Sequence, residues 1–392
     1  MAVPSGEEYQ ARVAEELNFF RDCRQVHELP DIFHYWSHYK IRPKLEAFGF
    51  SSPAGMFEKY LEELCARDPD RRQRFISIGA GNCDREIDLA RKLAQGHSHF
   101  VIDCLDLNPT MLERGSAAAE QAGVGAHIRG VQADFNQWEP ECEYDAVLAC
   151  QALHHVVNLE GLFQQIRGAL KPDGLFLISD IVGRNGHLRW PEALPIVQEF
   201  WRELPLSHRF NRMLQRQEET YVNWDCSTEG VEGIRSQDIL PLLLTHFHFQ
   251  LFLAHGNVID PFVDRAFGHN YDAAAEWDRN FIDRVHERDE QEMIAGQIKP
   301  VHMEAVVGKK PGRRLLFHPP FTPEFSVRWP DPAPPVVIVK IVEVPDPRVG
   351  PLLDENSALL NKVNALETRV RLAADSRWLR FGNGLGLGPR LR

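Results

Sequence analysis

Residues 75–84 read FISIGAGNCD, and residues 104–109 read CLDLNP. The first stretch is an apolar run that breaks into glycines at Gly79 and Gly81 and then opens a helical pattern. The second is another apolar run, which ends in the carboxylate of Asp106. This order predicts a β-α-β unit that holds a nucleoside, because glycines let the backbone approach the ligand and an acid after the next strand takes the ribose hydroxyls.

The composition is that of a soluble globular protein. The 392 residues are 43% hydrophobic and 26% charged, with a net charge of -12, so general nucleic-acid binding is disfavoured. The 7 cysteines include no CxxC pair, which fits a reducing compartment, and we expect a cytoplasmic protein. The N-terminus lacks the pattern of a signal peptide, and no apolar run approaches the length of a transmembrane segment.

Residues 1–70 are predicted to form a helical N-terminal extension, and residues 71–310 the main domain. The pattern of the main domain alternates between buried strands and helices. Strands are expected at 75–79, 100–106, 126–132, 144–150 and 175–181, with helices at 84–95, 109–122 and 158–170. Near-continuous apolar strands separated by helices predict an α/β fold, with a Rossmann-like, doubly wound, mostly parallel sheet.

Two cap insertions, residues 182–235 and 257–300, interrupt this alternation of strands and helices. Helices are expected there at 191–204 and 273–292, and a further helix at 236–244 lies between the insertions. Strands at 247–254 and 303–308 would complete a seven-stranded sheet with an antiparallel last strand. These two closing strands suggest a hairpin-like edge.

The C-terminal part, from residue 311 on, differs in amino-acid composition and pattern. Residues 311–350 are proline-rich and are predicted to be a stiff linker. Over residues 351–375, leucines 352, 359 and 366 recur every seven residues with Asn356, Val363 and Val370 between them. The repeat predicts a short coiled coil that forms a homodimer, and the alternative is a single solvated helix. Residues 376–392 are a basic tail, either flexible or in contact with an anionic membrane surface.

Three polar features follow successive predicted strands. The Gly79-Ala80-Gly81 turn follows the first strand, Asp106 closes the second, and Asp134-Phe135 follows the third. Each feature alone fits an ordinary turn or a helix cap. Three of them at successive strand ends are harder to explain in that way, because ligands of open α/β sheets bind at that edge.

Two further motifs complete an ordered set: YDAVLACQALHHV at 144–156 and LKPDG at 170–174, which we interpret as a turn into the fifth strand. The set resembles the class I S-adenosylmethionine-dependent methyltransferases over residues 74–310. The resemblance implies that S-adenosylmethionine is the cofactor. One departure is Cys83, which stands where the third glycine of the usual turn is found.

The resemblance also implies the cofactor-binding residues, which are Gly79, Ala80, Gly81, Asp106, Leu107, Met111, Asp134, Phe135, Cys150, Gln151 and His154. Among them, Asp106 would bind the ribose hydroxyls, while Asp134 and Phe135 would hold the edge and face of the adenine. His154 would pack beneath the cofactor.

Two residues are candidates for a catalytic base, His155 and Asp180. Histidine has a suitable pKa near neutrality, and Asp180 ends the fifth strand at the same edge. A purely structural role is the alternative for both. No metal site is predicted, because the histidines at 246, 248 and 255 lack a third ligand at the right spacing.

The predicted function is methyl transfer to a small-molecule or carbohydrate-like acceptor, at oxygen. The carbohydrate class is suggested by the tail SRWLRFGNGLGLGP, which looks like tails of bacterial glycosyltransferases and polysaccharide-modifying enzymes. Three alternatives stay open. They are a natural-product or lipid methyltransferase, a nicotinamide-dependent oxidoreductase, and a non-catalytic scaffold that recruits a partner through its C-terminal helix.

Overall fold

The computed structural model describes residues 6–21, 28–228, 230–329 and 362. The predicted coiled coil and basic tail lie outside the described residues, apart from residue 362. The part up to residue 329 forms one compact unit, and it holds every residue of the predicted site.

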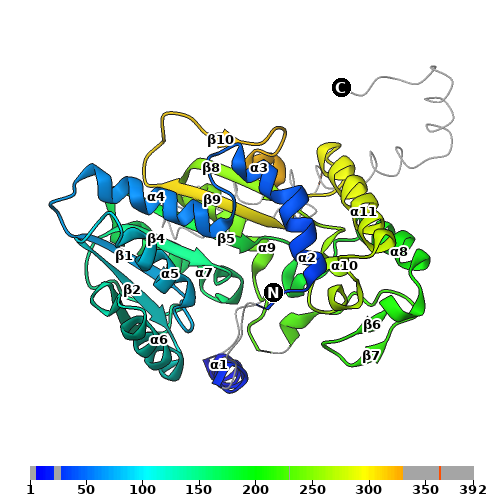
Figure 1. Ribbon diagram of the computed structural model, residues 1–392, viewed down its shortest axis with the longest axis horizontal. Coiled ribbons are helices and arrows are strands. Elements are labelled where there is room, and N and C mark those ends of the chain that lie inside the picture. The colour runs from blue at the N-terminus through cyan, green and yellow to red at the C-terminus, as the bar shows by residue number, and fades with distance from the viewer. Residues whose placement is uncertain (1–5, 22–27, 229, 330–361, 363–392) are drawn as a thin grey trace. The chain divides into compact units, whose positions relative to one another are not determined.

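One large sheet crosses this unit, with strand order β10-β8-β9-β5-β4-β1-β2-β3 (Figure 1). Its strands are β1 (Gln73–Ile78), β2 (Phe100–Asp106), β3 (Ile128–Gln132), β4 (Tyr144–Cys150), β5 (Leu170–Ile181), β8 (His248–His255), β9 (His302–Gly308) and β10 (Leu316–Phe317). Only β9 runs antiparallel to its neighbours β5 and β8. The predicted seven strands and their antiparallel last member are therefore confirmed, and the two-residue β10 adds an eighth.

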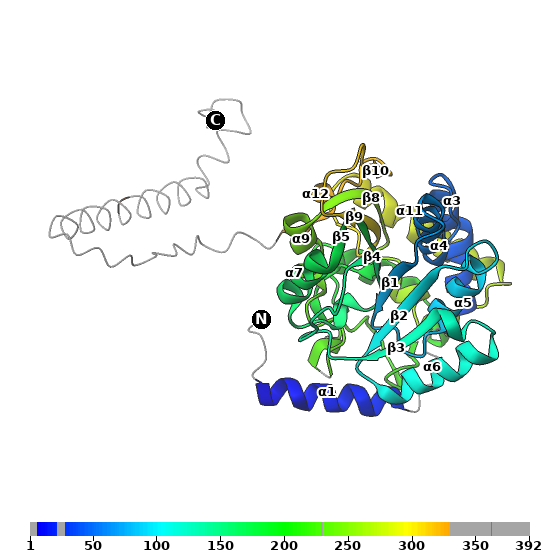
Figure 2. The same ribbon diagram turned by 90° about the vertical axis from the view of Figure 1, so that its left-hand side faces the viewer.

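Helices cover both faces of the sheet, which explains why its central strands are apolar throughout. Figure 2 shows α4 (Pro53–Arg67) and α5 (Asp84–Leu93) on one face, and α7 (Leu159–Ala169) and α9 (Ser236–His246) on the other. Helix α6 (Pro109–Gln121) packs against β3 and contacts α5. Apolar residues recur at helical spacing on α7, where Leu159, Leu162, Phe163 and Ile166 are all buried.

The N-terminal segment shares the core of the main domain. It forms α1 (Gly6–Arg21), α2 (Asp31–Trp36), a π-helical turn η1 (Ser37–Ile41) and α3 (Arg42–Glu46) ahead of α4. Ile32, Trp36 and Met56 are buried in the same hydrophobic cluster as the sheet. Residues 28–67 are therefore an integral layer of the domain.

The two insertions pack together beyond the carboxyl ends of the parallel strands. The first holds α8 (Leu194–Glu203) and the short hairpin β6 (Phe210–Asn211) and β7 (Arg216–Gln217), and the second holds α10 (Asp260–Val263) and α11 (Glu276–Ile294). Aromatic rings join them: the Phe200 ring lies 6.4 Å from Phe262 and 6.0 Å from Phe281, centroid to centroid. This packing makes a single cap from two separate stretches of sequence.

Several boundaries differ from the sequence-based expectations. Strand β5 begins at Leu170, so the LKPDG motif lies inside the strand, where the pairing with β4 shifts register between Tyr144 and Ala146. Helix α8 begins at Leu194 rather than 191, because the residues before it form a turn. Residues 316–317 and 323–326 of the proline-rich stretch form β10 and α12 (Pro323–Ser326).

Strand register places the predicted site residues at one edge. Ile78, the last residue of β1, pairs with Leu105 on one side and Ala149 on the other. The residues that follow these three are Gly79, Asp106 and Cys150. All three therefore project from the same carboxyl edge of the sheet.

Candidate functional site

The glycine turn after β1 is closely packed. Gly79 and Gly81 have φ values of 70° and 55°, which side chains rarely tolerate. A Cβ atom on Gly79 would lie 2.8 Å from Cβ of Ala152, and one on Gly81 would lie 3.2 Å from Cε of Met111. Backbone can therefore approach a ligand here only because both positions are glycine.

Asp106 faces this turn from the end of β2. Its Oδ2 accepts a hydrogen bond of 2.8 Å from the Gly81 backbone N–H, and its Oδ1 accepts one of 2.8 Å from Asn108. Burial raises the pKa of this carboxyl against the opposing effect of those bonds. A carboxylate offers about four acceptor positions, so Asp106 can still receive a ribose hydroxyl. The turn and the acid together fit the nucleoside end of the expected cofactor.

Cys83 does not crowd the glycine turn. It takes a left-handed conformation with φ 59° just ahead of α5, and its side chain is buried. Its Sγ packs toward Gly115 of α6, where an added Cβ would lie 2.7 Å away. The departure from a third glycine is therefore accommodated by a glycine on the neighbouring helix.

The adenine end of the predicted site lies after β3. Asp134 and Phe135 are both half-buried, as is Leu107, while Met111 is buried beneath the glycine turn. The Asp134 carboxylate accepts several hydrogen bonds. One of the donors is the hydroxyl of Tyr9 on α1, a residue that the sequence-based prediction of the site did not include.

The end of β4 supplies the floor of the site. Gln151 has a φ of 54°, and its backbone N–H donates to the Ser179 carbonyl at 2.8 Å. Arg85 Nη1 donates to Cys150 Sγ at 2.7 Å. Burial raises the pKa of the Cys150 thiol to about 12, so this cysteine stays protonated and is not a nucleophile.

Asp180, at the end of β5, is enclosed and heavily hydrogen-bonded. It is 1% exposed and accepts bonds from the backbone N–H groups of Ala152 and Leu153 at 2.9 and 2.8 Å. Its Oδ1 lies 2.7 Å from His154 Nδ1. The carboxyl therefore fixes the loop that carries the two neighbouring histidines, and it has no exposed surface from which to reach an acceptor.

His154 lies between two carboxylates. Its Nδ1 meets Asp180, and its Nε2 lies 3.4 Å from Glu232 Oε1. Burial opposes a charge on this imidazole, but the attraction of the two carboxylates outweighs burial and raises the pKa of His154 to about 10. His154 is thus an imidazolium at neutral pH.

Glu232 is the site residue that the sequence analysis missed. Its carboxylate lies 3.5 Å from His155 Nε2 and 2.6 Å from His187 Nε2, in addition to the contact with His154. Burial raises the pKa of Glu232, but the histidines beside it outweigh that effect and hold it well below the usual range. The only local signal is an acid between Gly230 and Gly233, both of positive φ, which is too common to mark a site.

His154, His155 and Glu232 offer ligand atoms within 4.8 Å of one another, a spacing that a metal ion could bridge. Glu232, however, already pairs with three imidazoles, so its negative charge is balanced without a cation. The His246, His248 and His255 side chains do not form such a group within the part of the chain that the structure describes.

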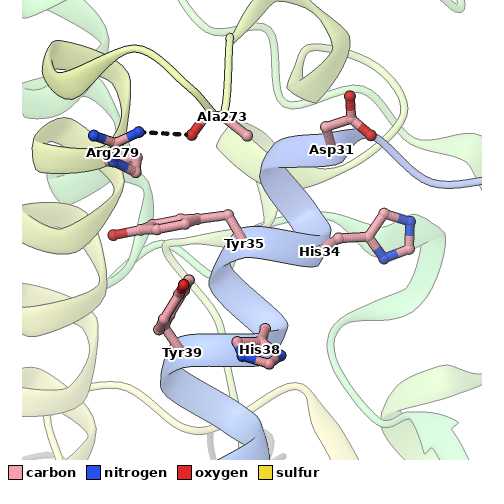
Figure 3. Close-up of a pocket in the computed structure, with 7 residues that line it drawn as sticks. All are labelled: Asp31, His34, Tyr35, His38, Tyr39, Ala273 and Arg279. Carbon is pink, nitrogen blue, oxygen red and sulfur yellow. Dashed lines mark hydrogen bonds between the residues drawn. The ribbon is translucent and has the colours of Figure 1, made fainter.

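A separate cavity of about 670 Å³ opens between α2 and the start of α11 (Figure 3). Tyr35 and Tyr39 project into it from successive turns, and Arg279 donates to the Ala273 carbonyl at its rim. None of the predicted site residues lines this cavity.

Comparisons with known proteins identify the domain. Residues 76–176 match a family model described as a methyltransferase domain, which spans the glycine turn, Asp106, Asp134 and the paired histidines. The chain therefore carries a domain of the class I S-adenosylmethionine-dependent methyltransferase family. S-adenosylmethionine is the cofactor of this family, and the glycine turn with Asp106 fits its nucleoside.

Curated relatives of the methyltransferase domain cover part of the chain. It is 29% identical over 163 residues to a sterol 24-C-methyltransferase of Gibberella zeae, covering 41% of each protein. It is 28% identical over 134 residues to the polyketide synthase PksR of Bacillus subtilis, covering 32% of this chain and 5% of that protein. The chain thus spans about two-fifths or less of these relatives.

Solved methyltransferase structures match at low identity. One is an O-methyltransferase from a trans-AT polyketide synthase of Brevibacillus brevis, with 14% identity, a TM-score of 0.37, and coverage of 64% of this chain and 71% of that one. Another is a geranyl diphosphate C-methyltransferase of Streptomyces coelicolor, with 9% identity, a TM-score of 0.39, and coverage of 76% and 98%. Among the helices of the described residues, none has the length and apolar character needed to cross a membrane.

Proposed function

We propose that this chain transfers a methyl group to a hydroxyl oxygen of a small-molecule acceptor, with His155 as the general base and Glu232 as its supporting carboxylate. The observation that carries the proposal is the 3.5 Å approach of Glu232 Oε2 to His155 Nε2 at the edge of the sheet that also bears Asp106. A hydroxyl is a weak nucleophile, so an acceptor of this kind benefits from a base at the site of attack.

The three histidines around Glu232 differ in what they can do. His154 already carries a proton at neutral pH, so it cannot accept another. Burial lowers the pKa of His187, and its Nε2 makes a 2.6 Å contact with Glu232, so we assign it to holding that carboxylate. His155 has a side chain that is 15% exposed against 5% for His154, and it is the imidazole we assign to the acceptor.

The proposed reaction is a direct displacement. When bound, the cofactor supplies an electrophilic methyl group on a sulfonium. The glycine turn and Asp106 would hold that cofactor, and His155 would take the proton of the acceptor hydroxyl as its oxygen is methylated. The negative charge of Glu232 stabilises the imidazolium that results. Asp180 contributes by fixing His154 and the loop, and is a positioning residue rather than the base.

A neutral, hydroxylated acceptor suits the surroundings best. The Arg189 guanidinium lies just past β5, is 5% exposed, and is paired with Asp260 at 2.8 Å. The Arg184 guanidinium stacks on Trp190 at 5.6 Å. Both cations already interact with other residues of the cap. This arrangement favours a sugar-like or natural-product hydroxyl over an anionic substrate. The polyketide synthase relatives support the natural-product class as the second candidate.

Titration calorimetry with S-adenosylhomocysteine tests the cofactor site first. Wild-type protein is expected to bind, and Asp106→Ala is expected to weaken binding by about 1–3 kcal/mol, the cost of an unpaired buried polar group. If wild-type protein fails to bind, the catalytic assignment loses its basis, and the scaffold or nicotinamide alternative takes its place.

Methyl transfer from radiolabelled S-adenosylmethionine tests the base, with monosaccharides, oligosaccharides and β-hydroxyacyl thioesters as acceptors. His155→Ala and Glu232→Gln are expected to lower kcat by about 10²–10⁴-fold while the affinity for S-adenosylhomocysteine is kept. His248→Ala, at an exposed histidine outside the site, is the matched control. Labelling at nitrogen or carbon, with no O-methyl product, would refute the proposal.

A further inference from the structure

Helix α1 reaches the adenine end of the site through Tyr9. The Tyr9 hydroxyl lies 2.9 Å from both carboxylate oxygens of Asp134, and it accepts a bond of 2.7 Å from Asn136 Nδ2. Desolvation and the neighbouring carboxylate raise the pKa of Tyr9, so the hydroxyl keeps its proton and donates it. Asp134 is the residue expected to receive the adenine amine, so Tyr9 and the cofactor use the same acceptor.

The acceptor positions of Asp134 are already filled. Beside Tyr9, the carboxylate receives the Asn136 backbone N–H at 2.9 Å, Asn136 Nδ2 at 3.2 Å and Gln137 Nε2 at 3.3 Å. A carboxylate offers about four acceptor sites. An adenine amine can bind Asp134 only if one of these donors leaves. The Asn136 and Gln137 donors belong to the turn that follows Asp134, with the exposed Gln137 amide making the longest of these contacts, whereas Tyr9 comes from a separate helix.

The same helix also contacts the segment that carries Glu232. Arg12 Nη1 donates to the carbonyls of Ser227 and Gly230 at 2.9 and 3.0 Å. The Tyr9 ring packs on a small apolar cluster of Val157, Val231 and Ile234. Val231 directly precedes Glu232 in the chain, so α1 buttresses the backbone on which the proposed supporting carboxylate sits.

The Glu232 segment is tied in turn to the catalytic loop. The backbone N–H of Ile234 donates to the His154 carbonyl at 3.0 Å. Asn136, which donates to the Tyr9 hydroxyl, also accepts the backbone N–H groups of Val157 and Asn158 at 2.8 and 2.9 Å. A continuous set of contacts therefore joins Asp134, Tyr9 and Glu232.

We infer that Tyr9 is a positioning residue that the cofactor displaces: its hydroxyl and the adenine amine compete for the carboxylate of Asp134, and release of Tyr9 couples cofactor binding to the placement of Glu232. The inference rests on the proposed function for the roles of Asp134 and Glu232. It has an unusual consequence, because removing the Tyr9 hydroxyl removes a competitor of the cofactor. A residue that merely supported the fold or contacted the cofactor would have the opposite effect on affinity.

Calorimetric titration with S-adenosylhomocysteine tests the competition in the full chain. Tyr9→Phe keeps the ring and its packing, and it is expected to tighten binding about 3–10-fold, as expected for loss of a competing hydrogen bond. Tyr39→Phe, at a tyrosine with 61% exposure, is the matched control and should leave the affinity unchanged. Unchanged or weaker binding by Tyr9→Phe overturns the inference. Absence of binding by wild type instead defeats the proposed function itself.

Hydrogen exchange over residues 230–234 tests the link to Glu232. Addition of S-adenosylhomocysteine is expected to change the exchange rate of this segment in the wild type. In Tyr9→Ala, which also removes the ring from the Val231 and Ile234 cluster, the rate without ligand should already differ and should respond little to ligand. An equal ligand response in wild type and Tyr9→Ala shows that α1 does not couple the two ends, and it refutes the inference even where binding is tight.

Discussion

Nδ1 of His154 lies 2.7 Å from Oδ1 of Asp180, which joins the loop after β4 to the end of β5. The same carboxylate accepts the backbone N–H groups of Ala152 and Leu153, so one buried acid fixes both the backbone and the first imidazole of the histidine pair. The opposite nitrogen of His154 then faces Glu232. A positively charged imidazole between two acids thus holds the carboxylate that we place behind His155.

Asp180→Asn should impair catalysis while cofactor binding is kept. An amide presents one acceptor oxygen in place of two, so it cannot serve His154 and the two backbone donors together. The loss of a charged hydrogen bond of this kind costs about 1–3 kcal/mol, so kcat is expected to fall about 10–100-fold. Steady-state methyl transfer measures the effect, and Asp88→Asn, at an exposed acid on α5, is the control. Undiminished kcat in Asp180→Asn would show that the pair has no positioning role.

The stability of the fold should depend on pH through His154. Its pKa in the folded chain is about 10 against an ordinary value of 6.5 for histidine, so the folded state binds the proton more tightly than the unfolded state does. The stabilisation is fully present below about pH 6.5 and is lost as pH rises through about 10. Thermal unfolding of the wild type between pH 7 and 10 should show a falling Tm.

The His154→Gln variant isolates this contribution. Glutamine keeps a donor toward Asp180 but does not titrate, so its Tm should be lower at pH 7 and should change less between pH 7 and pH 10 than that of the wild type. His248→Gln, at an exposed histidine, should behave as the wild type does. Parallel Tm curves for wild type and His154→Gln would contradict the assignment of a charged His154.

Metal removal should leave methyl transfer unchanged. The ligand atoms of His154, His155 and Glu232 are close enough for a metal ion, but Glu232 already contacts three imidazoles at 2.6 to 3.5 Å. The proposed reaction needs the imidazole of His155 as a proton acceptor rather than as a metal ligand. Activity is therefore expected to be equal before and after dialysis against EDTA. If dialysis abolishes activity and added Zn²⁺ restores it, the site is a metal centre and His155 is not a general base.

The central fold follows from local sequence signals. Strands β2 and β4 have the predicted bounds, because β2 is mostly apolar up to its last residue, Asp106, and β4 is mostly apolar up to the polar Gln151 that follows it. The LKPDG motif misled the prediction for β5, since proline and glycine usually mark a turn, whereas here they occupy a register shift at the start of the strand. Strand β10 is too short, at two residues, to leave a periodic pattern.

The residues of the candidate site likewise include some whose location was predictable from the sequence and some whose location was not. The shared location of Gly79, Asp106 and His155 at one edge of the sheet was predictable, because each lies at or shortly after the end of a strand and strand ends meet at that edge. Glu232 and Tyr9 were not, because their positions depend on how the cap and α1 pack over that edge. Glu232 lies 52 residues after Asp180 in the chain, and no repeat or spacing links the two. Contacts between segments so distant are set by tertiary packing, which one sequence does not display.

A substitution in the glycine turn can separate the cost of backbone strain from the cost of close packing. Gly79 and Gly123 have nearly equal φ values, 70° and 74°, so alanine meets the same left-handed strain at both positions. An added Cβ at Gly123 has nothing within 4 Å, whereas at Gly79 it would lie 2.8 Å from Cβ of Ala152. Only Gly79→Ala must therefore move the loop that leads to His154.

Gly123→Ala is expected to lower the free energy of unfolding by about 1 kcal/mol, the cost of a left-handed alanine, with unchanged affinity for S-adenosylhomocysteine. Gly79→Ala should carry the same strain plus about 1–3 kcal/mol for overpacking. Because the turn lies where the cofactor must approach, it should also weaken S-adenosylhomocysteine binding at least 10-fold. Urea unfolding and calorimetry measure the two effects separately. Equal losses in the two variants would show that the turn relaxes around a side chain, and that its closeness to Ala152 does not shape the site.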